Sequence, residues 1–162
     1  MKPAGHRESE ARSALKCDLA TEVLHSFGSL RFAATGWSML PAVWPGDTLV
    51  VDRVGQDQVR IGDVVLVGRE GTLCAHRIIG TVGGTDNRQW ITQGDGLPKP
   101  DRPVAGNELL GRVTYLIRAG RLIPVPAELS VVESLVAKVI RRSVPAARAL
   151  VYLNRMRQSP EE

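Results

Sequence analysis

Three side chains of the types used in nucleophilic catalysis follow one another along the chain. Ser38 lies in a turn rich in glycine and proline, directly before the apolar run 48–52. His76 lies inside another apolar run, and Asp101 follows in a loop. A serine, a histidine and an aspartate can supply a nucleophile, a general base and a carboxylate that orients the base. This combination predicts a serine peptidase.

Each of these residues also has an ordinary structural explanation. Serines in glycine and proline turns commonly hydrogen-bond the backbone, and aspartates such as Asp95 and Asp101 commonly form turns. A histidine in an apolar strand is commonly a core residue with its hydrogen bonds satisfied. The prediction therefore depends on the joint occurrence of Ser38, His76 and Asp101 around three separate apolar strands.

The spacing around Ser38 carries a family resemblance. Residues 36–47 read Gly-x-Ser-Met-x-Pro-x-x-x-x-Gly-Asp, which resembles the nucleophile box of the type I signal peptidases and the LexA-type self-cleaving repressors. Four later segments resemble further boxes of that superfamily in the same order: Ile-Gly-Asp-Val-Val-Leu-Val at 61–67, His-Arg-Ile-Ile at 76–79, Gln-Gly-Asp at 93–95 with Asp-Arg at 101–102, and Gly-Arg-Val at 111–113. The resemblance covers residues 30–118.

The resemblance favours the histidine branch, which is typical of the endoplasmic reticulum and archaea. No lysine lies between Ser38 and Lys99, which argues against a serine–lysine mechanism. The resemblance implies that His76 is the base and that Asp101 orients it, with Asp95 as a supporting or alternative carboxylate. A histidine base predicts activity that rises through about pH 6–7.

The same turn is expected to supply the remaining features of the site. The Ser38 backbone N–H is the expected oxyanion donor, a contribution of about 3 kcal/mol in other enzymes. We expect Trp37, Met39 and Pro41 to shape the substrate-binding region, and Arg77 to be structural. We expect no metal or cofactor, since Cys17 and Cys74 form no metal-ligand spacing.

The elements that must position these residues follow from periodicity and turn residues. Short apolar runs separated by glycine-containing turns predict a mainly β fold, an antiparallel and partly closed β-domain. The expected strands are 31–35, 48–52, 63–69, 73–82, 89–93, 109–117 and 121–125.

Helices are predicted on both sides of these strands. An apolar residue every fourth position before Gly28 predicts an amphipathic helix that starts near Glu8: Ala11, Leu15, Leu19, Val23 and Phe27. After Pro126, one helical stripe covers Val131, Val132, Leu135, Val136 and Val139, and a second runs from 146 to 156. The predicted organisation is an N-terminal helix (1–29), a catalytic β-domain (30–126) and a basic C-terminal helical extension (127–162).

The charge of the chain is concentrated near its end. The 162 residues carry a net charge of +4, but residues 118–157 hold eight basic and two acidic side chains, a balance of +6. Such a segment suits an acidic partner, an anionic membrane surface or nucleic acid, or is simply a solvated helix face. Aromatic residues make up only 4% of the chain, which disfavours nucleic-acid binding by stacked rings.

Two other functions remain open at this stage. A LexA-type regulator would cleave itself and bind DNA, although residues 1–30 have room for one helix and not for a helix-turn-helix domain. A non-catalytic β-module would bind peptides or lipid headgroups. The thiol of Cys74, two positions before His76, is either a nucleophile or a small core group.

The expected substrate is a peptide or precursor protein. The chain has no apolar run of membrane-spanning length and a polar start, so we expect a soluble cytoplasmic protein. Its basic C-terminal helices would allow peripheral contact with an anionic membrane.

Overall fold

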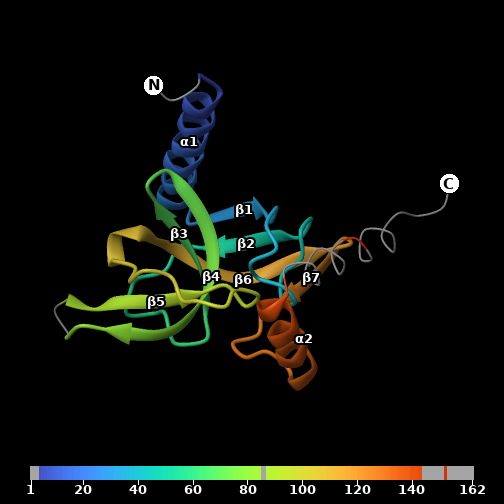
Figure 1. Ribbon diagram of the computed structural model, residues 1–162. Coiled ribbons are helices and arrows are strands. Elements are labelled where there is room, and N and C mark those ends of the chain that lie inside the picture. Colours follow the sequence, from blue (N-terminus) through green and yellow to red (C-terminus); the bar gives the residue numbers. More distant parts are fainter. Residues whose placement is uncertain (1–3, 85–86, 144–151, 153–162) are drawn as a thin grey trace.

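The fold is a single antiparallel sheet with a helix at each of two opposite ends (Figure 1). This is a computed structural model, and it describes residues 4–84, 87–143 and 152. Within them the strand order is β1-β2-β6-β3-β4-β5, with β7 paired to β6. The strands are β1 (Ser29–Ala33), β2 (Thr48–Asp52), β3 (Val64–Arg69), β4 (Thr72–Val82), β5 (Gln89–Gln93), β6 (Leu109–Arg118) and β7 (Arg121–Pro124), and a 3₁₀ turn, η2 (Gly106–Glu108), precedes β6.

The prediction of a mainly antiparallel β fold is confirmed, and each expected strand lies within two residues of an observed one. The sheet is not closed, since β1 and β5 form its two ends. The tight β3–β4 hairpin shows why glycine-containing turns correctly predicted the ends of the strands. Glu70 and Gly71 have φ values of +50° and +73°, the left-handed pair that a two-residue hairpin needs to match the twist of its strands.

The first four residues of β3 are buried on both faces of the sheet, because a core cluster packs against each face. Alternate side chains of a strand point to opposite faces. Val64 and Leu66 accordingly belong to one core cluster, whereas Val65 and Val67 belong to the other. The first cluster contains Met39, next to Ser38, so the turn that carries the serine is anchored in the main core.

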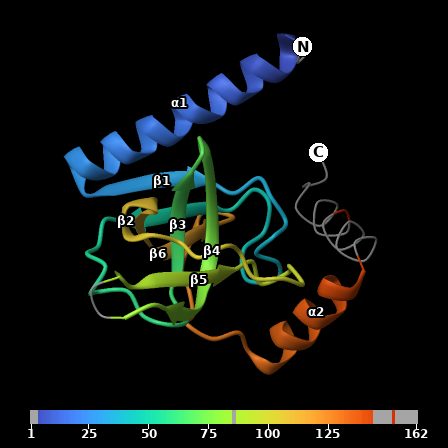
Figure 2. The same cartoon turned by 60° about the vertical axis from the view of Figure 1, so that its left-hand side comes forward.

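Helix α1 (Ala4–Phe27) lies across β1 and the β3–β4 hairpin (Figure 2). It begins at Ala4, before the expected start near Glu8. The predicted apolar stripe is largely exposed: Leu15 is 68% exposed, Leu19 61% and Phe27 78%.

A different face of α1, one that carries small residues, packs on the sheet. A Cβ on Gly68 would lie 2.8 Å from Cys17 Sγ, and one on Gly71 would lie 2.9 Å from Ala14 Cα. The helix therefore approaches the hairpin closely through small residues, and Leu24, 2% exposed, completes the contact. Periodicity alone did not identify this face.

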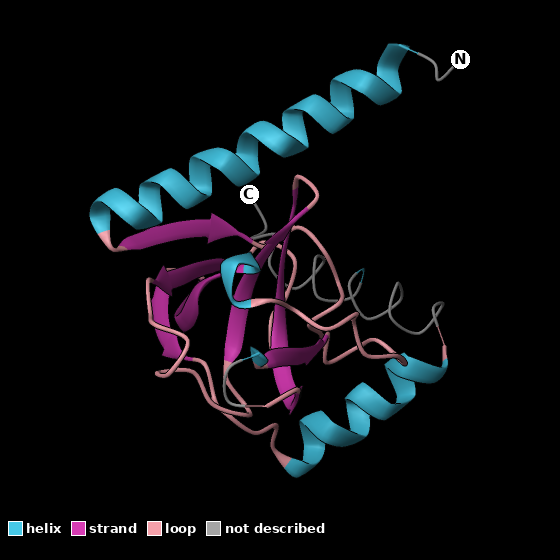
Figure 3. Cartoon of the chain, turned by 90° about the vertical axis from the view of Figure 1, so that its left-hand side faces the viewer, coloured by secondary structure: helices cyan, strands magenta, loops and turns pink. Residues whose placement is uncertain are grey.

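Helix α2 (Val131–Arg142) lies at the opposite end of the molecule from α1 (Figure 3). Ser130 and Glu133 form a reciprocal capping box at its start. The helix buries Ala137 and Ile140, whereas most of the predicted stripe is exposed. The second predicted helical stripe, 146–156, lies outside the described residues except for Tyr152. Neither α1 nor α2 combines the length and apolarity needed to cross a bilayer, and the rest of the described chain has no helix that does.

Candidate active site

Ser38, His76 and Asp101 lie in one hydrogen-bonded row. Ser38 is in the turn between β1 and β2, His76 is in β4, and Asp101 follows β5. The distance from Ser38 Oγ to His76 Nε2 is 3.1 Å, and the distance from His76 Nδ1 to Asp101 Oδ2 is 2.6 Å. An ionised carboxylate can only accept, so Nδ1 carries the proton and Nε2 is left to accept from the Ser38 hydroxyl. This is the arrangement that a serine nucleophile with a histidine base requires.

The electrostatics of Asp101 favour its ionised form. Burial raises the pKa of Asp101, but hydrogen bonds from His76 and from Thr92, together with the charge of His76, lower it by more. The net effect holds the pKa of Asp101 below its usual value. The carboxylate can therefore stabilise a protonated imidazole during a reaction.

Thr92 is a member of this row that the sequence interpretation missed. Its hydroxyl donates to Asp101 Oδ2 at 2.7 Å, and its carbonyl accepts from the Asp101 backbone N–H at 2.8 Å. Thr92 is 1% exposed and lies on the inward face of β5. A buried hydroxyl needs a hydrogen-bond partner. A threonine at an inward-facing strand position was therefore the sequence signal that could have identified Thr92 as part of the site.

The turn that carries Ser38 is held by a buried aspartate, Asp47. Asp47 accepts from Arg118 Nε at 2.9 Å, from Arg118 Nη2 at 2.7 Å and from the Trp44 backbone N–H at 2.7 Å. Arg118 also donates to Ala42 O at 3.0 Å. The Gly-Asp pair that ends the 36–47 pattern thus fastens the loop to β6, and the Leu40–Pro41 bond within the loop is cis.

The loop that begins at Gly94 packs against the serine turn. The Gly96 N–H donates to Ser38 O at 2.8 Å. A Cβ on Gly94 would lie 2.5 Å from the same oxygen, so a larger residue there would displace the serine turn. Helix α2 holds this loop from the other side, because Arg141 Nε donates to Asp95 O at 2.9 Å.

Asp95 does not take the role expected for it as a supporting or alternative carboxylate for His76. Its carboxylate forms a bidentate pair with Arg77, with Nε to Oδ1 at 2.9 Å and Nη2 to Oδ2 at 2.8 Å. Arg77 also donates to the carbonyls of Gly62 and Pro126. The carboxylate bonded to His76 is that of Asp101, whereas Asp95 joins Arg77 in a buried scaffold beneath the site. The structural assignment expected for Arg77 agrees with these contacts.

We expect Arg77→Met to lower the free energy of unfolding by about 3–5 kcal/mol, because it leaves the Asp95 carboxylate buried without its partner. Urea unfolding followed by circular dichroism measures this change. The matched control is Glu70→Gln, which breaks the exposed Glu70–Arg102 pair (3.1 Å) and should cost less than about 1 kcal/mol. Equal losses in the two variants would contradict a structural role for the buried pair.

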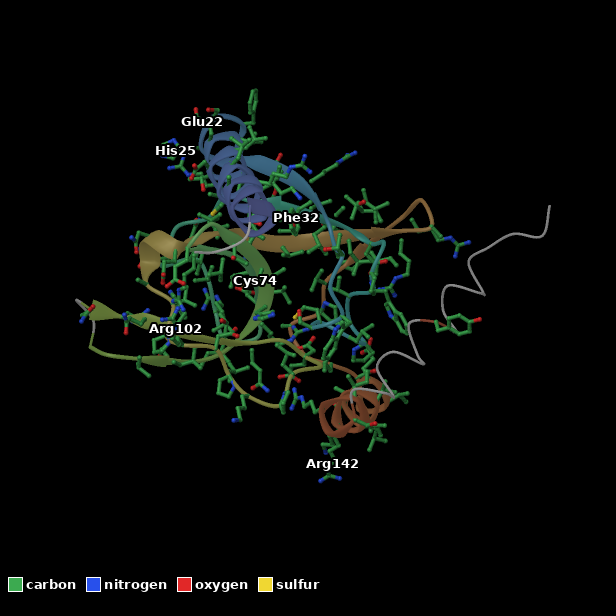
Figure 4. The ribbon with its side chains drawn as sticks, turned by 45° about the horizontal axis from the view of Figure 1, so that its top comes forward. Glu22, His25, Phe32, Cys74, Arg102 and Arg142 are labelled. Carbon is green, nitrogen blue, oxygen red and sulfur yellow. The ribbon has the colours of Figure 1, made fainter. Side chains whose placement is uncertain are left out.

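A small apolar cavity of about 170 Å³ opens beside Ser38. It lies between the chain of β1 and the start of β4, and Figure 4 labels Phe32 and Cys74, which line it from these two sides. The residues lining it are Phe32, Ala34, Thr35, Gly36, Ser38, Met39, Val43, Leu49, Leu73, Cys74 and Ala75. A larger apolar pocket of about 560 Å³ under α1 shares Phe32, Thr35 and Leu73 with this cavity.

Of the three residues expected to shape the substrate region, only Met39 lines this cavity. Trp37 instead packs with Trp44 against the buried Leu40–Ile140 cluster. Pro41 is buried, and it lines neither of the two pockets described above. Trp37 therefore lies on the α2 side of the serine turn, and neither Trp37 nor Pro41 contributes to this cavity in the described residues.

The thiol of Cys74 is poorly suited to act as a nucleophile. Burial and the nearby Asp101 charge raise its pKa to about 11, although Arg69 lowers it slightly. At pH 7.5 we therefore expect iodoacetamide to alkylate Cys74 more than about a hundredfold more slowly than a free cysteine. Mass spectrometry of a Cys17→Ser variant, in which Cys74 is the one remaining cysteine, measures the alkylation rate of this thiol.

The complementary measurement is peptide cleavage by Cys74→Ser, which should stay within a few-fold of the unmodified protein. Fast alkylation of Cys74, together with loss of cleavage in Cys74→Ser, would assign the nucleophile to the thiol instead of Ser38.

Within the described residues, no group of three or more histidine, cysteine, aspartate or glutamate side chains could hold a metal ion. In comparisons with known proteins, no family model and no curated protein sequence matches this chain.

Proposed function

We propose that this protein is a serine endopeptidase, similar in its motifs to the histidine branch of the signal peptidases, that cleaves a peptide or protein precursor. The observation that carries the proposal is the row formed by Ser38, His76 and Asp101, with contacts of 3.1 Å and 2.6 Å, beside an apolar cavity. The order of five motifs along residues 36–113 supports the same family.

In this mechanism Ser38 Oγ attacks the carbonyl carbon of the scissile peptide while His76 Nε2 takes the hydroxyl proton. The carbon–nitrogen bond then breaks, and His76 gives the proton to the departing amine. A water molecule releases the acyl group from Ser38 by the same two proton transfers. Asp101 holds the imidazole and stabilises its charged form throughout.

The Ser38 backbone N–H is the group we assign to the oxyanion. It makes no hydrogen bond to any other part of the described chain, whereas the Ser38 carbonyl is occupied by Gly96 N–H. A donor that is already in place and unoccupied costs no rearrangement when charge develops on the carbonyl oxygen.

The strand edges beside Ser38 indicate how a substrate would bind. In the described residues β1 pairs only with β2, and β5 pairs with β4 only from Arg77 onward. The outer edges of β1 and of residues 72–76 therefore offer free backbone groups on both sides of the cavity. An extended peptide can pair with such edges and place a small apolar side chain in the cavity.

The test is incubation of the purified protein with a peptide library that varies small residues, followed by mass analysis of the library and of the protein itself. Cleavage by the unmodified protein and not by Ser38→Ala is the expected result. Cleavage of the protein's own chain would favour a self-cleaving regulator. No cleavage of either, with detergent or lipid supplied, would favour a peptide-binding module.

A further inference from the structure

The outward face of α2 is apolar and basic. Val131, Val132, Leu135 and Val139 are 79%, 70%, 57% and 59% exposed. Lys138 and Arg142 are also exposed and lie three residues after Leu135 and Val139, so the 3.6-residue period places them on the same side. Figure 4 shows Arg142 pointing away from the sheet at the end of the helix.

No carboxylate belongs to this face. The one acidic residue of α2, Glu133, is only partly exposed and is engaged at the helix start, where its Oε2 accepts from the Ser130 N–H at 2.9 Å. Position 133 lies on the side of the helix that carries Ala137 and Ile140, both buried. The exposed stripe therefore combines four aliphatic side chains with two cations and no anion.

The inner face of α2 fixes this orientation. Ile140 is 3% exposed and packs with Leu40 in a cluster that Trp37 and Trp44 complete. Arg141 adds its hydrogen bond to the Asp95 carbonyl. The helix cannot turn its aliphatic stripe toward the sheet without giving up these contacts, so within the described residues the stripe stays available to a partner.

We propose that this face docks the protein on the surface of an anionic lipid bilayer. Amphipathic helices of this kind lie in the interface plane, with aliphatic side chains at the acyl boundary and lysine and arginine at the headgroups. The two cations match anionic headgroups, in line with the +6 balance of residues 118–157. The proposal concerns where the protein binds and does not depend on its peptidase activity.

A second copy of the chain is a poorer occupant for this face. Two copies joined through α2 would bring Lys138 and Arg142 of each copy together, and no carboxylate on the face would offset them. An anionic bilayer removes that repulsion and attracts each cation. Since α2 separates the bilayer from the Ser38 turn by one helix diameter, docking would hold the turn about 10 Å from the lipid surface.

Helix α1 supplies a matched control within the same chain. Its outward face also exposes Leu15 and Leu19, but Asp18 and Glu22 follow them three residues on. Because this face carries both positive and negative charges, it has no net attraction to anionic lipid. Arg12 and Lys16 on α1 are both exposed and have the same four-residue separation as Lys138 and Arg142.

The experiment is flotation of the 162-residue chain with vesicles of phosphatidylglycerol and phosphatidylcholine, compared with phosphatidylcholine alone. We expect binding to the anionic vesicles only. Lys138→Gln/Arg142→Gln should weaken it by about 30-fold, the effect of two cations near an anionic surface. Leu135→Gln/Val139→Gln should weaken it by at least about tenfold.

The control variants Arg12→Gln/Lys16→Gln and Leu15→Gln/Leu19→Gln should bind as the unmodified protein does. The two residues changed in each of the four double variants are exposed, so circular dichroism should show every variant folded. Four results would each overturn the proposal: no binding to anionic vesicles at millimolar lipid, equal binding to phosphatidylcholine, equal losses in the α1 controls, or a lipid-free dimer that Leu135→Gln/Val139→Gln dissociates.

Discussion

Ser38→Ala should lower kcat for peptide cleavage by about a million-fold, close to the loss seen when a serine peptidase is deprived of its nucleophile. The alanine removes the oxygen that forms the acyl intermediate, while the cavity and the expected oxyanion donor remain. KM should therefore change far less than kcat. Single-turnover assays with mass detection measure the residual rate.

The double variant Ser38→Ala/His76→Ala sharpens this prediction. The effects of substituting catalytic groups that act as a unit do not add, so the double variant should lose no more activity than either single variant. Ser26→Ala is the control, because that exposed hydroxyl on α1 bonds only Glu22 in the described structure. Additive losses, or a Ser38→Ala enzyme within tenfold of the unmodified one, would exclude Ser38 as the nucleophile.

Asp101→Asn should lower kcat by about ten-thousand-fold while leaving the fold intact. The asparagine amide can donate to His76 Nδ1, and that hydrogen bond moves the imidazole proton to Nε2. A protonated Nε2 cannot accept the Ser38 hydroxyl proton. Cleavage kinetics measure the loss, and the ¹⁵N chemical shifts of the His76 ring report the change of tautomer.

The same variant has a defined pH dependence of stability. Folding lowers the pKa of Asp101, so the carboxylate stabilises the native state above the usual aspartate range and loses this effect as pH falls through the lowered value. The unfolding free energies of Asp101→Asn and the unmodified protein should differ at pH 7 and converge as the pH falls through the lowered pKa of Asp101. A difference that persists unchanged into acid would assign it to packing.

The strands and the row of reactive residues were accessible from the sequence because both follow local rules. Alternating apolar residues bounded by glycine predict strands, and the order of motifs identified Ser38, His76 and Asp101. The choice between Asp95 and Asp101 depended on which of two adjacent β4 side chains each carboxylate reaches: Asp95 pairs with Arg77, and Asp101 bonds His76. The path of the loop after β5 decides this, and a linear pattern carries it only indirectly.

The helices show where such rules fail. Regular apolar spacing correctly predicted that residues near Leu15 and Leu135 are helical, yet these two side chains are exposed. Helix α1 instead docks through the small residues Ala14 and Cys17, because its close approach to Gly71 and Gly68 leaves little space. Helix α2 docks through Ala137 and Ile140. Which face docks depends on the shape of the partner surface, and helical period does not encode it.

The strand edges that stay unpaired in the described residues, those of β1 and of residues 72–76 in β4, also make this protein vulnerable to self-association. A free strand edge can template a strand from another molecule as readily as a substrate, and edge strands commonly resist this with charge. Arg31, exposed at the centre of β1, places a cation on that edge, and α1 lies across the same strand. Colloidal stability and access for an extended peptide are therefore set by the same few residues, and any change that widens the opening also raises the tendency to aggregate.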